Sequence, residues 1–362
     1  MGNMPVKYSN HKTSSKKQSP TFIKELCHQF SLEDLKKSTN NFDEALKIGQ
    51  SLYSIVYKGY LKHNGENEYP VAIERMTLRS GDWMFKKVIE LYSQLHHPNL
   101  ISLIGFCDQK DEKIIVYEYM FNGTLYDHLR SRDMESLSWK KRLEICIGAA
   151  RGLHYLHTGA KRTIFHCDIK PQTILLDNKM VPKLSQLGIS LQEKRSKSKP
   201  TLIKLDTNQL HNIIGTTGHG YMAPECVRTN AFTDKCDVYS FGMVLLDVAC
   251  TDYKHTILDK MKMFMDHQNE FFEEDIIDVG NFFEKFLDAE IMNPSLIRLI
   301  APKCLAVFMD IMKRCLNVEP NERPTMGEVE VELEHALALQ EEADCGESNG
   351  DYNFFPTTNS MP

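Results

Sequence analysis

The spacing of apolar residues changes near residue 120, and this change most constrains what the chain can fold into. Before that point, apolar and polar residues alternate in short runs, as they do in half-buried β-strands. The runs are ALKIGQ, SIVYKGYL, YPVAIERM, LISLIGFC and KIIVYEYM, interrupted by one helical segment, WMFKKVIELYSQL. Later segments such as SWKKRLEICIGAARGLHYLHTG repeat apolar residues every three or four positions. The pattern predicts an α+β protein with a small β-rich lobe followed by a larger helical lobe.

The same pattern predicts four segments along the chain. They are a flexible arm over 1–28, the β-rich lobe over 29–120, the helical lobe over 121–340 and a mobile tail over 341–362. Ser31 has the residue type and position of an N-cap for a short helix at the start of the first lobe. The segment DVYSFGMVLLDVAC is apolar nearly all round, which predicts a helix buried in the second lobe.

Charge and cysteine usage narrow the function classes. The formal net charge of −6 gives no general attraction to nucleic acid, so we expect no nucleic-acid partner. Ten cysteines occur without a C-x-x-C pair, which favours reduced thiols in the cytoplasm. The longest apolar run is about a dozen residues, too short to span a bilayer.

A set of short motifs occurs in one order along the chain. They are IGQSLYSIVYKG, VAIERM, FHCDIKPQTILLD, KLSQLG, MAPE, DVYSFG and RPTM. Their order and approximate spacing resemble those of eukaryotic protein kinases. Phrases such as RLEICIGAARGLHYLHTGA and LISLIGFCD are similar to plant receptor-like kinases of the Pelle family, near the Pto-like and FERONIA-type groups. This resemblance covers roughly residues 28–340 and implies a bilobal protein kinase fold with a role in signal transduction.

The resemblance places unusual residues where the family holds ATP and magnesium. Glu74 stands at the position of the lysine that binds the α- and β-phosphates, and Val88 stands at that of its glutamate partner. Thr173 and Gln186 stand at the two magnesium-ligand positions, the second being the aspartate of D-F-G. Repulsion between Glu74 and a phosphate about 4 Å away amounts to ~4 kcal/mol at an effective dielectric near 20. We therefore expect no metal site.

The glycine-rich loop is altered in the same direction. It keeps Gly49, but Ser51 and Ser54 stand at the other two glycine positions, where side chains crowd the phosphates. For this stretch alone, an ordinary hairpin is better supported than a phosphate-binding loop. Arg75 is adjacent to the lost lysine, but alternation along a strand points it to the opposite face.

Other motif positions match the family. By resemblance, Asp168 is the residue that accepts the substrate hydroxyl proton, and Lys170 is its companion near the γ-phosphate. Cys167 replaces the arginine that responds to activation-loop phosphorylation, so that switch should be absent. Three positions that support the family's fold rather than its chemistry also match: Asp237, Glu225 and Arg323.

The resemblance also implies an apolar slot for the adenine ring. Its lining residues are Gly49, Val56, Ala72, Tyr117, Met120 and Leu175. Such a slot binds a flat heterocycle without a metal, although the same residues would be equally apolar in an empty core. Binding of ATP without magnesium is therefore the one cofactor interpretation that stays open.

Each of two further segments allows two interpretations, a solvated segment without a specific role and a functional site. The basic stretch Lys194–Lys199 lies beside Ser196, Ser198 and Thr201, and is either a solvated loop or a docking and phosphorylation site for an active kinase. Gly2, in MGNMPV, is either part of a solvated tail or a weak lipidation signal. The second option, or a partner, would bring the protein to the inner face of the plasma membrane.

These observations predict a receptor-like cytoplasmic pseudokinase, a scaffold or decoy for active receptor-like kinases or for immune and signalling receptors. Whether the chain is an enzyme stays open, because Asp168 and Lys170 leave an atypical Ser/Thr kinase of low activity as the alternative. A decaying duplicate without a role is a third interpretation. Binding of ATP with and without magnesium separates the first two.

Overall fold

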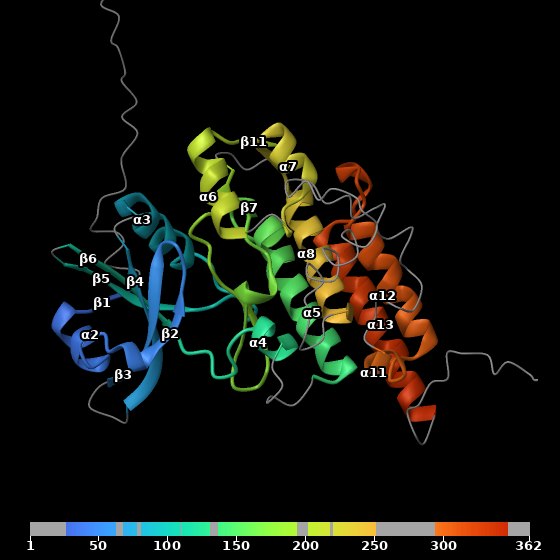
Figure 1. Cartoon of the computed structure of the whole chain (residues 1–362), viewed down its shortest axis with the longest axis horizontal. Helices are drawn as coiled ribbons and strands as arrows, with labels where there is room; N and C mark the ends of the chain where they lie inside the picture. The colour runs from blue at the N-terminus through green and yellow to red at the C-terminus, as the bar shows by residue number, and fades with distance from the viewer. Residues whose placement is uncertain are drawn as a thin grey trace, which may run out of the picture.

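The computed structural model describes residues 27–62, 68–77, 81–109, 111–130, 137–193, 202–217, 220–250 and 294–346. Strands dominate up to residue 118 and helices dominate after it. Figure 1 shows the two parts as separate lobes, with the blue strands of the first beside the green to red helices of the second. The predicted α+β architecture of a small β-rich lobe and a larger helical lobe is confirmed.

One sheet forms the first lobe, in the order β1-β5-β6-β4-β3-β2. Its strands are β1 (His28–Gln29), β2 (Lys47–Gln50), β3 (Ser54–Lys62), β4 (Glu68–Met76), β5 (Leu103–Gln109) and β6 (Glu112–Glu118). Strand β1 runs parallel to β5, and every other pair is antiparallel. Strands β2 to β6 correspond to the five alternating runs, whereas β1 joins the last residue assigned to the flexible arm to the first residue of the lobe. Residues 1–26 of that arm, including Gly2, lie outside the described residues.

Two helices pack on this sheet. Helix α2 (Leu32–Ser38) begins as predicted, because the Ser31 hydroxyl accepts the Asp34 amide at 3.1 Å. Its buried Leu35 joins Val71, Ile73 and other strand residues in a small core. Helix α3 (Gly81–Tyr92) packs against β5 and β6, and buries Phe85, Val88 and Ile89 among its apolar residues. Helix α3 thereby places one face beside the cleft between the lobes.

Long helices build the second lobe. They are α5 (Trp139–His154), α8 (Asp234–Cys250), α12 (Pro302–Cys315) and α13 (Met326–Gly346), with the shorter α4 (Leu125–Arg130), α6 (Thr207–Thr217), α7 (Pro224–Thr229) and α11 (Pro294–Ile297) around them. Helix α8 is buried on every side, as its apolar composition predicts; Val238, Phe241 and Val244 are fully enclosed. Among the described helices, none combines the length and the apolar character needed to cross a bilayer.

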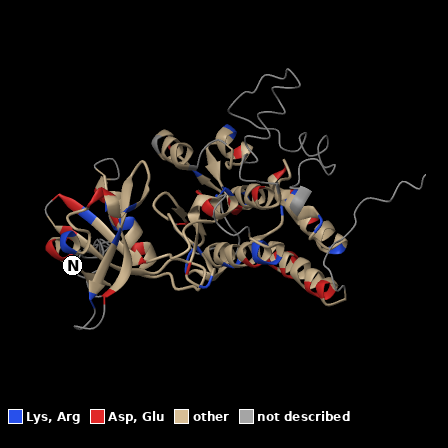
Figure 2. Ribbon diagram, turned by 60° about the horizontal axis from the view of Figure 1, so that its bottom comes forward, with Lys and Arg blue, Asp and Glu red and all other residues tan. Residues whose placement is uncertain are grey.

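Helices α5 and α13 are joined by ion pairs at the surface. Arg151 pairs with Glu330 at 3.2 Å and also with Glu334, and Lys140 pairs with Glu341 at 3.3 Å. Figure 2 shows acidic residues along the outer part of α13 and both charge signs dispersed over the rest of the visible face. Helix α13 continues to Gly346, so regular structure extends past residue 340 into the predicted tail.

Short strand pairs fix the loops of the second lobe that face the first. The pairs are β8 (Ile174–Leu176) with β9 (Pro182–Leu184), β7 (Ile164–Phe165) with β10 (Leu191–Gln192), and β11 (Ile203–Lys204) with β12 (Ala231–Phe232). Strand β9 leads into the loop that contains Gln186, and β7 leads directly into the loop that holds Asp168. Both loops therefore meet at the cleft.

Candidate functional site

A cavity of about 830 Å³ lies between the two lobes. Its walls come from β2, β3, β4 and α3 on one side and from the loops after β7 and β9 on the other. The twelve residues predicted for the catalytic, phosphate and magnesium positions and for the adenine slot line this one cavity: Gly49, Val56, Ala72, Glu74, Val88, Tyr117, Met120, Asp168, Lys170, Thr173, Leu175 and Gln186. The structure thus brings the predicted set together, while the role of each residue stays a prediction.

Glu74 points into the cleft from β4 and is held by the neighbouring loop. Its carboxylate accepts the Ser54 hydroxyl at 2.6 Å, and the Ser54 and Ser51 hydroxyls lie 3.0 Å apart. Burial raises the pKa of Glu74, and hydrogen bonds from the Ser54 and Tyr117 hydroxyls oppose that rise. The two serines at the predicted glycine positions therefore form one polar network with the residue at the predicted lysine position.

Ser51 also shapes the turn between β2 and β3. Its hydroxyl accepts the amides of Tyr53 at 3.1 Å and Ser54 at 3.0 Å, which are donors that a phosphate-binding loop would present to its ligand. On the opposite face of β4, Arg75 donates to Glu112 at 2.8 Å and does not line the cavity. The predicted direction of Arg75 is confirmed, so it supplies no positive charge to the cleft.

Lys87, which the sequence analysis missed, links α3 to the loop after Gln186. Its Nζ donates to the carbonyl of Gly188 at 3.0 Å and to that of Ser190. Burial lowers the pKa of Lys87 to about 8. Val88, the next residue, is buried and contributes only apolar surface to the cavity. Helix α3 is thus attached across the cleft by Lys87 and not through an ion pair with Glu74.

Asp168 and Lys170 form an ion pair of 2.8 Å at the base of the cavity. The Thr173 hydroxyl donates to the Asp168 carbonyl at 2.7 Å and accepts the Lys170 amide at 3.2 Å, so it stabilises its own loop. Gln186 lies exposed at the cavity wall with a left-handed φ of 68°. Magnesium favours anionic oxygen ligands, whereas the Thr173 hydroxyl is already hydrogen-bonded within its loop and the Gln186 amide is neutral. The residues present therefore do not fit a magnesium–triphosphate group.

Acidic groups outnumber basic ones around the cavity. Among the described residues that line it, Lys170 is the only cation, against the carboxyl groups of Glu74, Glu118, Asp127 and Asp168. Glu118 is paired outside this set with a lysine of β9. A polyphosphate entering the cavity would meet more negative than positive charge, whereas its apolar walls remain suitable for a flat neutral ring.

Helix α6 was not predicted, and it lies against the mouth of the cavity. The Lys170 side chain donates to the Thr216 carbonyl, and the Tyr53 hydroxyl donates to Asn212 Oδ1 at 2.9 Å. Figure 1 shows α6 on the side of the second lobe that faces α3, and a smaller cavity of about 250 Å³ separates the two helices. The segment between Gly188 and MAPE therefore contains a helix that contacts both lobes beside Asp168. The spacing of Leu210, Ile213 and Ile214 was the available signal for it.

The fold, with its two lobes and a cleft lined by the motif residues, defines a protein kinase domain. The model of the protein tyrosine and serine/threonine kinase family matches residues 42–333, and the chain belongs to this family.

The chain is also similar to individual receptor-like protein kinases of a plant. The chain is 40% identical to receptor-like protein kinase ANXUR2 of Arabidopsis thaliana over 326 residues, which cover 88% of this chain and 35% of that protein. Receptor-like protein kinase FERONIA is 37% identical over 334 residues, covering 90% and 35%, and THESEUS 1 is 40% identical over 318 residues, covering 86% and 34%. The chain thus spans about a third of the length of these relatives.

Proposed function

We propose that this chain is a receptor-like pseudokinase of the cytoplasmic type, which acts in signalling by binding other proteins and does not transfer phosphate. One observation carries the proposal. Glu74 occupies the wall of the cleft as a buried carboxyl group that Ser54 and Tyr117 stabilise. The hydrogen bonds of this carboxyl group come from neighbouring residues of the protein, so no ligand is needed to stabilise it. A carboxyl group cannot supply the positive charge that phosphoryl transfer needs.

The electrostatics of the reaction support the same conclusion. Negative charge spreads over the transferred phosphoryl group, and catalysis consists mainly of neutralising and positioning it. In this cleft, the Thr173 hydroxyl is hydrogen-bonded within its own loop. Lys170 forms an ion pair with Asp168 and donates a hydrogen bond to the Thr216 carbonyl. Asp168 alone, acting as a proton acceptor, leaves that charge without compensation. The retained acidic residue is therefore insufficient for the reaction.

The similarity to receptor-like kinases supports a proposal for partners and location. We propose active receptor-like kinases, or signalling and immune receptors, as partners of a scaffold or decoy. The protein would then work in the cytoplasm, at the inner face of the plasma membrane, through a partner or through the weak signal at Gly2. The basic segment Lys194–Lys199 is the proposed docking and phosphorylation site, and it lies outside the described residues.

The basic segment has its own test. We would replace its lysines and arginine with serine and measure two quantities: phosphorylation by an active receptor-like kinase domain and co-purification of that kinase. Loss of either in a variant that remains folded supports the site. If neither quantity changes, the segment is a solvated loop and the contact surface lies elsewhere.

Phosphate incorporation tests the proposed function itself. The purified chain is incubated with radiolabelled ATP, magnesium and a generic protein substrate, beside an Asp168→Ala variant and an active receptor-like kinase domain. We expect equal background labelling for the chain and its variant. Magnesium-dependent labelling that disappears in Asp168→Ala would overturn the proposal and establish an atypical kinase of low activity.

A further inference from the structure

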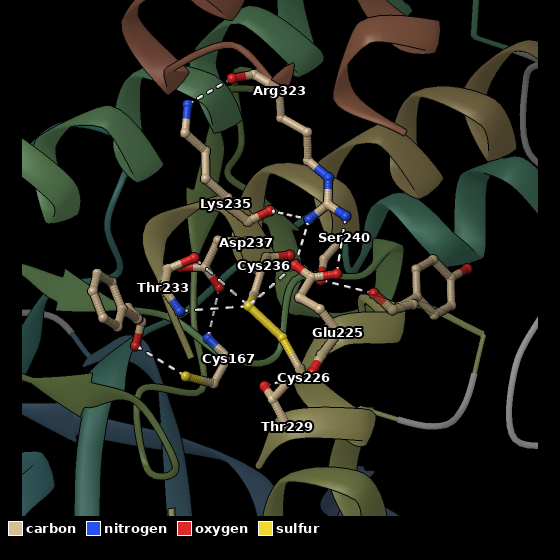
Figure 3. Close-up of a disulfide and its surroundings, with 12 residues drawn as sticks. Cys167, Glu225, Cys226, Thr229, Thr233, Lys235, Cys236, Asp237, Ser240 and Arg323 are labelled. Carbon is tan, nitrogen blue, oxygen red and sulfur yellow. Dashed lines mark hydrogen bonds and ion pairs between the residues drawn. A yellow bond between two sulfur atoms is a disulfide. The ribbon is translucent and has the colours of Figure 1, made fainter. Parts of the chain in front are cut away.

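Cys226 of α7 and Cys236 of α8 are joined by a disulfide (Figure 3). Their Cα atoms lie 6.8 Å apart, and the two cysteines are ten positions apart in the sequence. This finding departs from the expectation of reduced thiols throughout. The bond lies within the segment that links MAPE to the start of the central helix of the second lobe.

The disulfide is one of the few contacts that hold α7, beside the Glu225–Arg323 ion pair, the partly buried Val227 and packing against β12. Cys226 is the one buried residue of α7, whereas Arg228, Thr229 and Asn230 at the end of this helix are exposed. No side chain caps the amino-terminal end of α7. Because the ion pair of this short helix lies at Glu225 and its last residues are exposed, breaking the sulfur bond should loosen its carboxyl-terminal end.

Metal binding is the competing use of these sulfur atoms. One carboxylate oxygen of Glu225 and the two sulfur atoms lie within 4.8 Å of one another, which is close enough for a shared ion. However, both oxygens of Glu225 accept hydrogen bonds from Arg323, at 2.6 and 2.9 Å. A zinc site normally uses four ligands, and among the described residues this cluster offers only the two sulfur atoms beyond Glu225. The geometry therefore favours thiol chemistry over metal binding.

The two cysteines are each adjacent to a residue that supports the lobe. Glu225 precedes Cys226 and pairs with Arg323, as Figure 3 shows. Asp237 follows Cys236, and its carboxylate accepts the amides of the loop that leads to Asp168. The disulfide thus connects the end of the segment containing α6 and α7 to the anchor of the loop below the cleft.

We propose that Cys226 and Cys236 form a reversible thiol–disulfide switch that fixes α7 on α8 when oxidised and releases it when reduced. A peroxide is the oxidant. One thiolate attacks a peroxide oxygen, which yields a sulfenic acid and, after protonation, one water molecule. The second thiol attacks this sulfur and expels the other water, so that two thiols and hydrogen peroxide give one disulfide and two waters. A dithiol reverses the change by exchange.

Three measurements on the full chain test the switch. The first is differential alkylation with mass spectrometry after equilibration in glutathione buffers from fully reduced to fully oxidised. The second is the rate of trypsin cleavage after Arg228, which is exposed in α7. The third is the melting temperature with and without dithiothreitol. The variants are Cys226→Ala and Cys236→Ala, with Cys345→Ser as the matched control because Cys345 is an exposed free cysteine.

We expect the pair to convert within the buffer series, and both remaining readouts to follow it. Reduction should lower the melting temperature by roughly 5 °C and speed cleavage after Arg228 about tenfold. Both effects should vanish in Cys226→Ala and Cys236→Ala and persist in Cys345→Ser. Three results would overturn the switch: a pair that remains disulfide-bonded under dithiothreitol, a pair that never oxidises, or stoichiometric zinc in the reduced chain that is lost in Cys236→Ala.

Discussion

Two regions of this molecule hold buried charged or polar residues, and the hydrogen bonds and ion pairs of these residues differ between the two regions. In the second lobe, Arg323 reaches Glu225 and the carbonyls of Asn317 and Lys235, while Asp237 binds the backbone of a loop 70 residues away. We call Asp237, Glu225 and Arg323 the frame. In the cleft, the contacts of Ser51 with Ser54 and of Thr173 with its own loop are local.

This contrast shows which residues the fold depends on. Frame contacts join elements that are far apart in the sequence, so their loss affects the packing of the whole lobe. In the cleft, Ser51, Ser54 and Glu74 satisfy one another, and only a few contacts, such as that of Lys170 with Thr216, reach distant segments. We therefore expect these residues to need neither a nucleotide nor a metal to remain stable. A kinase fold can therefore persist when the groups that bind phosphate have changed, provided that the frame is intact.

The largest expected effect is on Arg323→Ala. This change removes the fully buried guanidinium and leaves the partly buried carboxyl group of Glu225 without its partner, and breaking a buried pair typically costs about 3–5 kcal/mol of unfolding free energy. Asp237→Ala should be nearly as severe, because two buried amides lose their acceptor. Denaturant unfolding gives the values, with Arg314→Ala as the control because its pair lies at the surface. Equal stability of Arg323→Ala and the control would remove the distinction between frame and cleft.

A smaller loss is expected for Asp168→Ala in the cleft. Its partner Lys170 keeps a hydrogen bond to the Thr216 carbonyl and lies beside an open cavity that admits water. We expect a cost of about 1 kcal/mol, close to that of one hydrogen bond. The same unfolding experiment measures it. A cost as large as that of Arg323→Ala would mean that the cleft contributes to the fold as much as the frame does.

The smallest effect concerns Lys87 and depends on pH. The pKa of Lys87 is about 8 in the folded protein and near 10.5, the usual value for lysine, in the unfolded chain. The charged lysine therefore lowers the stability of the folded protein below pH 8. That cost disappears as the pH rises from 8 to 10.5, because the folded protein releases its proton first. Relative to Lys87→Met, the wild type should gain about 1 kcal/mol between pH 9 and 10. A stability difference between the two proteins that is constant over this range would contradict the assigned burial of Lys87.

Much of the fold could be predicted from the sequence because the patterns are local. Strands β2 to β6, the cap at Ser31 and the buried α8 each follow from the spacing or type of neighbouring residues. Strand β1 has only two residues and depends on pairing with β5, so no local pattern indicates it. Helix α6 has helical spacing, but its basic and polar surroundings made a loop the natural expectation.

The residues of the cleft could be predicted individually, but their partners could not. The resemblance placed Glu74, Ser51 and Ser54 at motif positions, and it gave no reason to expect that the three would form one network. Lys87 was overlooked because its contacts lie about a hundred residues away. The same holds for the disulfide, because the spacing of Cys226 and Cys236 matches no common motif and only the packing of α7 on α8 brings them together.

The central claim is that the frame maintains the kinase fold although the cleft no longer binds magnesium–ATP. Nucleotide binding measured with and without magnesium tests this claim most directly. Thermal-shift titrations of the full chain would compare ATP alone, ATP with magnesium, and adenosine. Because acidic groups surround the cavity and its walls are apolar, we predict that adenosine stabilises the chain at least as much as ATP does, and that magnesium adds nothing. A larger shift with magnesium–ATP than with adenosine, abolished by Asp168→Ala, would show that the cleft still binds the triphosphate and would contradict the proposed loss of its chemistry.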